Sequence, residues 1–226
     1  MLLMKDTQLL QTRRQFLRGA SLAAGFFAVP GLFAEEFMRK TPWVTQGPLY
    51  PDELPLDTDN DLIIVSNSVT PAVGEITHLS GRLLGLHGEP IRNAVIEIWQ
   101  VDSTATYLQE RNHKPAGSFD VNFQGFGRCE TGSSGDYYFR TIKPVPYPGR
   151  SAPHIHFLIR TKGRDPWTTQ LYSKGHPGNE RDHIYRRIGD ARAQEAVTVD
   201  FAPVKDSRVG ELAAKFDIVL GFTPET

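Results

Sequence analysis

Two histidines separated by a single residue are the first candidates for chemistry in this chain. His154 and His156 flank Ile155 inside an apolar segment. Alternate side chains of a β-strand share a face, so both imidazoles would point one way while Ile155 and Phe157 point the other. Two neutral imidazoles placed in this way can bind one metal ion. Histidines in strands are also commonly hydrogen-bonded polar groups, so the triplet alone leaves both interpretations open.

A tyrosine lies on a proline-rich segment just before these histidines. Pro144, Pro146 and Pro148 surround Tyr147, and each proline ring fixes its own φ, which stiffens the backbone that carries the phenol. A tyrosine packed at a sheet corner would explain the segment equally well. As a ligand, a phenolate is a hard anionic donor that suits Fe(III) better than Zn(II) or Cu(I). A tripositive ion also lowers the phenol pKa from about 10, which allows the phenolate to bind at neutral pH.

A second tyrosine, Tyr107, follows a predicted strand that ends in a polar turn. The segment 79–102 reads as a hairpin followed by that strand, because its apolar residues alternate around the turn-forming residues 88–90. Nothing else in this segment has an evident chemical role.

Short apolar blocks separated by turn-forming residues predict an all-β chain. Turn signals at 88–90, 132–136 and 144–149 separate these blocks. The predicted strands are 62–66, 77–84, 94–101, 137–142, 154–160, 168–172 and 216–220. About seven short strands predict a β-sandwich core with long loops.

Helices are predicted at only two places, 190–196 and 206–215. The loop 108–129 is long enough to suggest a functional role, since structureless loops of that length are uncommon in compact domains.

Composition limits the classes of protein that need consideration. The chain has 226 residues, a formal net charge of −1 and one cysteine, Cys129. It has no global basic field, so we do not expect nucleic acid as a partner. A single cysteine can form neither an internal disulfide nor a cysteine-rich zinc or iron–sulfur site. Any metal must therefore be held by histidine, tyrosine or carboxylate.

The first 34 residues predict an export signal. Arg13 and Arg14 precede Phe16 and Leu17, and an apolar run over 20–34 follows. This order resembles a bacterial twin-arginine signal, and the run is shorter than the roughly 20 residues of a membrane span. We expect a signal segment at 1–34, a catalytic domain at 35–226, no stable membrane span, and a periplasmic or extracellular location.

These segments, in this order, resemble the intradiol ring-cleavage dioxygenases, and most closely the protocatechuate 3,4-dioxygenases. The resemblance covers nearly the whole chain after residue 40, and the matching motifs lie at 41–42, 46–48, 127–129, 138–144, 153–157, 169–172 and 216–220. It implies a β-sandwich of the intradiol dioxygenase type that holds Fe(III). By matching motifs, Tyr107 corresponds to the equatorial tyrosinate, Tyr147 to the axial tyrosinate that leaves on substrate binding, and His154 and His156 to the equatorial and axial imidazoles.

The resemblance also implies groups around the substrate. Gln170 and a nearby arginine correspond to residues that act on the substrate and the developing anion, and Gly47, Pro48 and Ile184 fall where the family lines its pocket. Arg150 is our candidate for the arginine, and with Tyr147 and Gln170 it completes the predicted catalytic set.

Two departures from the family pattern concern the segment between the second tyrosine and the first histidine. The chain has the sequence Arg-Ser-Ala-Pro at 150–153 where the protocatechuate enzymes have Arg-Pro-Ala. The aromatic residue that often follows Tyr-Pro is replaced by Gly149, which would open the pocket.

The implied activity is O2-dependent opening of a catechol-type ring between its two hydroxylated carbons, which gives a muconate-type diacid. A secreted β-sandwich binding module, with structural histidines and tyrosines, is the alternative from another class. A metal hydrolase is disfavoured, because it would leave both tyrosines unused. Exposed strand edges would permit assembly into a homo-oligomer.

Overall fold

The computed structural model describes residues 38–66 and 68–222. The predicted signal segment, 1–34, lies outside these residues and stays a prediction, as does the boundary at residue 35. Within the described ranges, no helix combines the length and apolar character needed to cross a bilayer.

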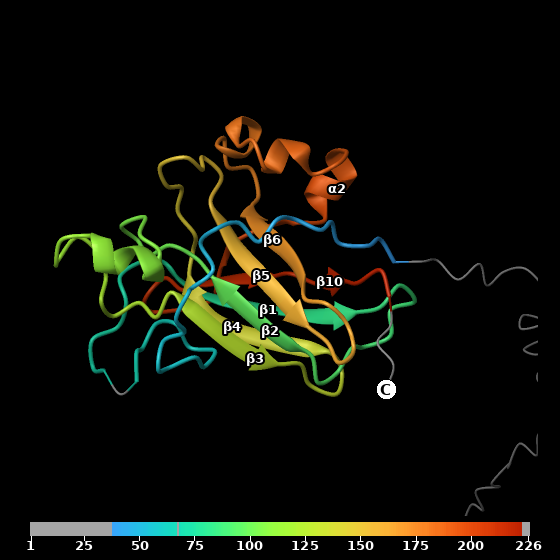
Figure 1. Cartoon of the computed structure of the whole chain (residues 1–226), viewed down its shortest axis with the longest axis horizontal. Helices are drawn as coiled ribbons and strands as arrows, with labels where there is room; N and C mark the ends of the chain where they lie inside the picture. The colour runs from blue at the N-terminus through green and yellow to red at the C-terminus, as the bar shows by residue number, and fades with distance from the viewer. Residues whose placement is uncertain (1–37, 67, 223–226) are drawn as a thin grey trace, which may run out of the picture. The chain divides into compact units, whose positions relative to one another are not determined.

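Ten strands of the described chain form two five-stranded sheets (Figure 1). In the first sheet, β1 pairs with β4 on one side and with β9 and β10 on the other, and β8 extends the sheet beyond β9. In the second sheet the order is β3, β2, β5, β6, β7. The bounds in the first sheet are β1 Ile76–Leu84, β4 Asp136–Ile142, β8 Ala202–Pro203, β9 Leu212–Lys215 and β10 Ile218–Val219. Those in the second are β2 Val95–Trp99, β3 Phe126–Glu130, β5 His154–Arg160, β6 Trp167–Ser173 and β7 Thr198–Val199.

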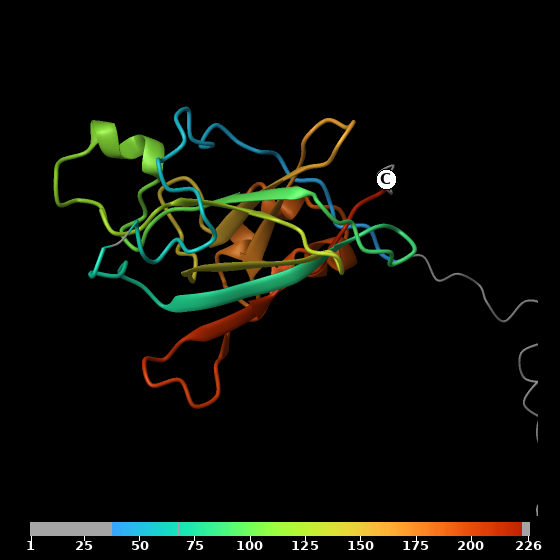
Figure 2. The ribbon, with the colours of Figure 1, turned by 90° about the horizontal axis from the view of Figure 1, so that it is seen from below.

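The main hydrophobic core lies between the sheets, as the predicted sandwich requires. Ile155, Phe157 and Ile159 of β5 enter this core together with Phe139 of β4, and all four are at most 1% exposed. Burial of each such side chain contributes roughly 1.5–3 kcal/mol. In Figure 2, β1 lies beneath the strands of the second sheet. The alternate residues of β5, including both histidines, therefore face away from the main core.

Helical structure is limited to short pieces in the described chain. One α-helix, α2 (Ala191–Glu195), confirms the prediction at 190–196, and the Asp190 carboxylate caps it by accepting from the backbone N–H of Ala193. Three 3-10 turns are also present: η1 (Leu108–His113), η2 (Asn179–Arg181) and η3 (Tyr185–Arg187).

The predicted helix at 206–215 is wrong. Residues 212–215 form β9, in which Leu212 and Ala214 point inward while Ala213 and Lys215 are exposed, and the strand pairs with β1. Gly210 has φ +74°, a left-handed conformation that interrupts a helix. The segment forms the outer part of a β8–β9 hairpin, which projects below the body in Figure 2.

The predicted strand at 62–66 is also wrong. Leu62 and Ile63 are fully buried, but their backbone groups bond to three separate segments, so no ladder forms. The Leu62 N–H donates to Arg140, the Leu62 carbonyl accepts from Gln124, and the Ile63 carbonyl accepts from Ala72. The apolar pattern here reflects burial of side chains rather than strand pairing.

The loop predicted at 108–129 contains more regular structure than expected. It begins with η1 and ends in β3, an edge strand that pairs with β2 from Val95 to Trp99. The sequence Phe-Gly-Arg-Cys-Glu of β3 has no clear alternation, because Phe126 and Gly127 are both buried. That absence of period-two patterning explains why the strand was not predicted.

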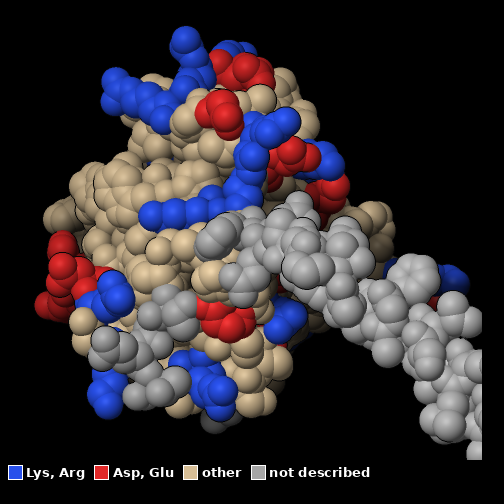
Figure 3. Space-filling view, turned by 90° about the vertical axis from the view of Figure 1, so that its right-hand side faces the viewer, with Lys and Arg blue, Asp and Glu red and all other residues tan. Residues whose placement is uncertain are grey.

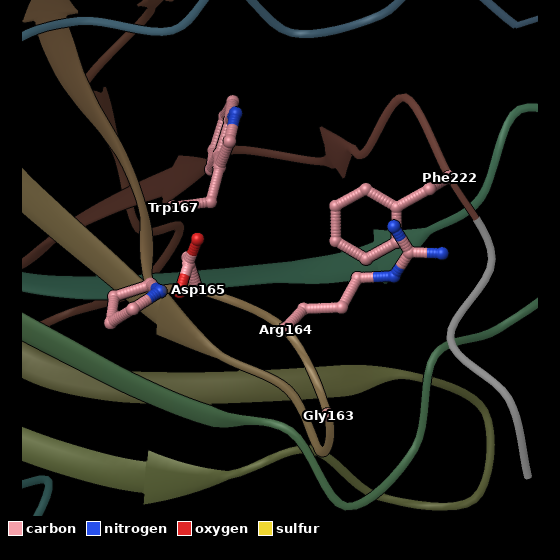
Figure 4. Close-up of a pocket in the computed structure, with 6 residues that line it drawn as sticks. Gly163, Arg164, Asp165, Trp167 and Phe222 are labelled. Carbon is pink, nitrogen blue, oxygen red and sulfur yellow. The ribbon is translucent and has the colours of Figure 1, made fainter.

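An open hollow of about 720 Å³ lies at the turn between β5 and β6 (Figure 4), at the end of β5 opposite His154. The Arg164 guanidinium lies 4.2 Å from the centre of the Phe222 ring. Trp167 and Phe222 also pack against the main core. The hollow therefore belongs to the edge of the core, and none of the predicted site residues lines it.

Charged side chains are mixed on the face drawn in Figure 3, where acidic and basic groups are separated by uncharged areas. This distribution agrees with the formal net charge of −1.

Candidate metal centre

Strand β5 places two imidazoles on the outer face of the second sheet. His154 and His156 are each 2% exposed, and they lie on the face opposite Ile155 and Phe157, as strand alternation predicts. A second apolar cluster, formed by Trp99, Leu158 and their neighbours, covers this outer face. The histidines are therefore buried without entering the main core.

Tyr107 is held by the loop that follows β2. The buried Asp102 carboxylate accepts from the backbone N–H groups of Thr104 (2.9 Å) and Thr106 (3.0 Å), which closes the turn. The Glu110 carboxylate accepts from the Tyr107 N–H at 2.9 Å. These bonds at both sides fix the backbone of Tyr107, whose side chain is 2% exposed.

Tyr147 and Arg150 are paired across a tight turn. The Tyr147 N–H donates to the Arg150 carbonyl at 3.1 Å, and the Arg150 N–H donates to the Tyr147 carbonyl at 2.9 Å. Pro148 and Gly149 occupy the centre of the turn, and Gly149 has φ +92°. Proline followed by a glycine with positive φ is typical of a type II turn. The local sequence therefore places a phenol and a guanidinium side by side.

Four side chains converge on one point. The Tyr107 hydroxyl oxygen lies 3.0 Å from Nε2 of His156 and 3.5 Å from Nε2 of His154. The Tyr147 ring centre lies 5.2 Å from that of Tyr107 and 5.6 Å from that of His154. Metal–donor bonds of about 2.1 Å place neighbouring donor atoms about 3 Å apart. The spacing of the Tyr107 oxygen and the two Nε2 atoms therefore fits a single metal ion, and the Tyr147 ring lies beside them.

The hydrogen bonds of the imidazoles also fit a metal site. Nδ1 of His154 lies 2.7 Å from the Ala152 carbonyl oxygen, which can only accept, so Nδ1 carries the proton and Nε2 presents a lone pair. Nδ1 of His156 is buried and has no hydrogen-bond partner. The His156 ring instead stacks on Trp99, with ring centres 4.7 Å apart and planes 10° from parallel. Both Nε2 atoms thus face the Tyr107 hydroxyl.

Burial sets the charge state of these groups. Burial lowers the pKa of His154 to about 3, and burial with the neighbouring His154 lowers the pKa of His156 well below 6.5. Burial raises the pKa of Tyr107 well above 10 and also raises that of Tyr147. The metal-free site therefore holds neutral imidazoles and neutral phenols, and a bound cation would favour the phenolates.

The donor set points to a hard metal ion. Across residues 38–66 and 68–222, no three histidine, cysteine, aspartate or glutamate side chains gather to hold a metal ion. The cluster of Tyr107, Tyr147, His154 and His156 instead combines two hard oxygen donors with two imidazoles. This combination suits Fe(III).

The buried imidazole of His154 predicts a pH dependence of stability for the metal-free protein. Its pKa is about 3 in the fold and 6.5 in the unfolded chain. As pH falls below 6.5, the unfolded chain therefore binds a proton at His154 before the folded protein does. The free energy of unfolding should then decrease by about 1.4 kcal/mol per pH unit between pH 6.5 and pH 3. Denaturant unfolding at pH 7, 6 and 5 measures it. The dependence should be weaker in His154→Gln and unchanged in the control His113→Gln, whose side chain is exposed; equal dependence in all three proteins would contradict this assignment.

Arg150 lies in a buried network beside these four side chains and is 6% exposed. Its Nε donates to Oδ2 of Asp182 at 2.8 Å, and one terminal nitrogen donates to Oε1 of Gln170 at 2.9 Å and to the Tyr172 hydroxyl at 3.3 Å. Nε2 of Gln170 donates to the Thr45 carbonyl at 2.9 Å. The structure therefore brings together Arg150 and Gln170, which the sequence had placed in the catalytic set.

The three predicted pocket residues differ in their distance from the cluster. A Cβ on Gly47 would lie 3.9 Å from Cε1 of His156, so Gly47 borders the site directly. Pro48 is exposed, and its carbonyl accepts from Nε2 of Gln109 at 3.0 Å. Ile184 lies two residues after Asp182 and is half-buried against the cluster of Val44, Ala152, Tyr172, Tyr185, Ile188 and Val197. Around Gly149, a Cβ would meet no atom within 4 Å, so that side of the turn is open.

Three residues that contact the site were not predicted as part of it: Asp182, Tyr172 and Trp99. Asp182 and Tyr172 contact Arg150 from separate elements, and Trp99 stacks on His156 from the neighbouring strand. Trp99 and Tyr172 resemble ordinary apolar strand residues in the sequence. Asp182 is one of several charged residues in its loop, so the sequence had no signal that distinguished it.

Comparisons with known proteins agree with this geometry. A family model described as Dioxygenase matches residues 45–221. The protocatechuate 3,4-dioxygenase beta chain of Burkholderia cepacia is 34% identical over 173 residues, which cover 74% of this chain and 72% of that one. The 6-chlorohydroxyquinol 1,2-dioxygenase of Cupriavidus pinatubonensis is 31% identical over 126 residues, which cover 51% and 41%.

A solved structure agrees as well. The dioxygenase domain of a dioxygenase and carbohydrate-binding protein fusion from Streptomyces sp. SirexAA-E aligns with a TM-score of 0.61 and 28% identity, over 81% of this chain and 99% of that domain. The chain belongs to the intradiol ring-cleavage dioxygenase family. It is therefore an enzyme of the oxidoreductase class. The predicted fold class is confirmed, and so is the resemblance seen in the sequence. The chain spans 41–65% of the length of matched catechol and hydroxyquinol dioxygenases, and 72% of the protocatechuate enzyme chain.

Proposed function

We propose that this protein is a non-haem Fe(III) dioxygenase that opens a catechol-type ring between its two hydroxylated carbons. The carbons on either side of the cleaved bond become the two carboxyl groups of a muconate-type diacid, and O2 supplies the added oxygen. The observation that carries this proposal is the convergence of two phenols and two imidazoles on one buried point. Tyr107, Tyr147, His154 and His156 would hold the iron.

The iron would favour the deprotonated catechol and render its ring reactive towards O2. The protein supplies a buried setting, in which Tyr107 and both histidines are each 2% exposed, and charges in such a setting interact strongly. Burial raises the pKa of the Tyr147 phenol, so its phenolate is a base that can accept a proton from a substrate hydroxyl.

Arg150 would stabilise negative charge that develops on the substrate. Its guanidinium is held by Asp182 and Gln170 rather than exposed to water, so it needs little reorganisation during the reaction. Its charge and hydrogen bonding also lower the pKa of the Tyr147 phenol, although burial is the larger influence and raises it. Arg150 can therefore favour anions at both Tyr147 and the substrate.

A protocatechuate-like substrate is our specific proposal within the catechols. It is supported by the 34% identity to the Burkholderia cepacia chain, which is named for that substrate.

A panel of catechols tests this function. Iron-loaded protein should consume one O2 per ring cleaved and give a diacid whose mass is that of the substrate plus two oxygen atoms, with protocatechuate turned over faster than catechol or hydroxyquinol. Zinc-loaded protein is the control and should be inactive. Cleavage next to, rather than between, the hydroxylated carbons would refute the proposed reaction, and an equal rate for all three substrates would refute the proposed preference.

A secreted binding module was the second hypothesis from the sequence, and no contact or comparison favours it. Export by a twin-arginine route, with a periplasmic or extracellular location, remains our proposal from the sequence of residues 1–34. Assembly into a homo-oligomer likewise remains a proposal, which the open sheet edges at β7 and β8 would permit.

A further inference from the structure

The direction of the Arg150 side chain is set by its contacts rather than by its place in the chain. Arginine has many rotamers, and the turn at 147–150 fixes only its backbone. Three contacts restrain the guanidinium: Nε to Asp182 at 2.8 Å, and one terminal nitrogen to Gln170 at 2.9 Å and to Tyr172 at 3.3 Å. Asp182 is the only one of these partners that carries a full negative charge at neutral pH.

The Asp182 carboxylate is itself firmly held. Its side chain is 0% exposed. One oxygen accepts from Arg150 and, at 3.4 Å, from the Ala152 N–H; the other accepts from the N–H groups of Ile184 (3.0 Å) and Tyr185 (2.9 Å). Burial raises its pKa, but the hydrogen bonds from Arg150 and the backbone outweigh this and hold the pKa below 3.8. Asp182 is therefore a fixed anion.

We propose that Asp182 is a positioning residue, which holds the Arg150 guanidinium against Gln170 and Tyr172, beside the proposed iron ligand His154, in the orientation that acts on the substrate. This inference rests on the proposed function. The same carboxylate also fixes the backbone of Ile184, a predicted pocket residue, so one side chain connects the guanidinium to the pocket wall. Outer residues that orient catalytic groups in this way typically contribute a factor of about 10 to 100 in activity.

A purely structural role for Asp182, balancing a buried charge, is the alternative, and the chain offers as a control a partly exposed pair with the same bonding pattern. Oδ2 of Asp61 accepts from Arg140 at 3.0 Å, and Oδ1 accepts from the Ile63 N–H at 3.0 Å. This is the same combination of an arginine pair and a backbone bond two residues onward, located beside the first sheet. Asp61→Asn should therefore affect stability without affecting turnover.

The kinetic test uses iron-loaded protein with protocatechuate as substrate. Asp182→Asn should lower kcat by about 10- to 100-fold while KM changes by less than about threefold. In the Arg150→Met background the same substitution should lower kcat by less than about twofold, because its effect passes through Arg150. Full additivity of the two losses would overturn the proposal. If Asp182→Asn does not fold, Asp182→Glu, which keeps the charge but shifts the carboxylate, should give the same pattern.

A second readout needs neither iron nor activity. In metal-free protein the Arg150 Nε–H should give a ¹⁵N-correlated NMR signal, assigned by its loss in Arg150→Met. Its hydrogen exchange should be at least about tenfold faster in Asp182→Asn than in the wild type or Asp61→Asn. Unchanged exchange would overturn the proposal. If the wild type cleaved no catechol, the proposed function would be wrong, while this signal would still decide whether Asp182 orients Arg150.

Discussion

Tyr147→Phe is expected to lower kcat for catechol cleavage by about 10²- to 10³-fold and to remove much of the visible absorption of the iron-loaded protein. The substitution keeps the ring, which packs against Tyr107 with centres 5.2 Å apart, and removes only the hydroxyl. That hydroxyl is both a proposed iron ligand and a base for the substrate proton, and loss of a positioned base typically costs about 10²- to 10⁴-fold. Absorption spectra and steady-state kinetics measure the two effects.

A control variant tests whether the expected effect depends on the position of the Tyr147 hydroxyl rather than on the loss of any tyrosine hydroxyl. Tyr138 of β4 is 40% exposed, and its hydroxyl lies 2.6 Å from Nδ1 of His78. Tyr138→Phe also removes one hydroxyl and should leave both the spectrum and kcat unchanged. If Tyr147→Phe behaved like this control, Tyr147 would be a packed loop residue and its proposed role would be wrong.

Arg150→Ala has the second large effect that we expect. Removing one group that stabilises a developing anion typically costs about 10²- to 10³-fold in kcat. Iron content should remain within about twofold of the wild type, because Arg150 is not a proposed ligand. Metal analysis and kinetics on the same samples test this difference.

The loss of Arg150 also leaves the buried Asp182 carboxylate unpaired. Breaking a buried ion pair in this way costs about 3–5 kcal/mol, so thermal unfolding should occur at lower temperature and the assays need a temperature below that transition. Arg140→Ala, which removes the partially exposed pair with Asp61, is the control and should retain turnover. Normal turnover in Arg150→Ala would show that the guanidinium has no part in the reaction.

Much of the fold was predictable because its strands have strong local patterns. Strand β1 (Ile76–Leu84) alternates between buried and more exposed residues, whereas β5 (His154–Arg160) is a short apolar run buried on both faces. Turn-forming residues follow both strands, so both were found within one residue of their bounds. A helix was wrongly predicted at 206–215 because the alanine and lysine residues of this segment have high intrinsic helix propensity. Pairing with β1, a contact with residues more than 130 positions away, decides its structure instead.

The site was predictable only where residues are close in sequence or belong to a long motif. The shared face of His154 and His156 follows from strand geometry, and the pairing of Tyr147 with Arg150 follows from the turn between them. The contact between Arg150 and Asp182 joins residues 32 positions apart, on loops that carry several other charged side chains. No local pattern specifies such a contact, so it required the structure.

The most direct test of the account is a crystal structure of the iron-loaded protein, with anomalous diffraction measured at the iron absorption edge. We predict one strong peak within about 2.3 Å of the hydroxyl oxygens of Tyr107 and Tyr147 and of Nε2 of His154 and His156. A peak bound by other side chains would contradict the proposed iron site. The absence of a peak between these four donor atoms in fully iron-loaded protein would contradict it equally.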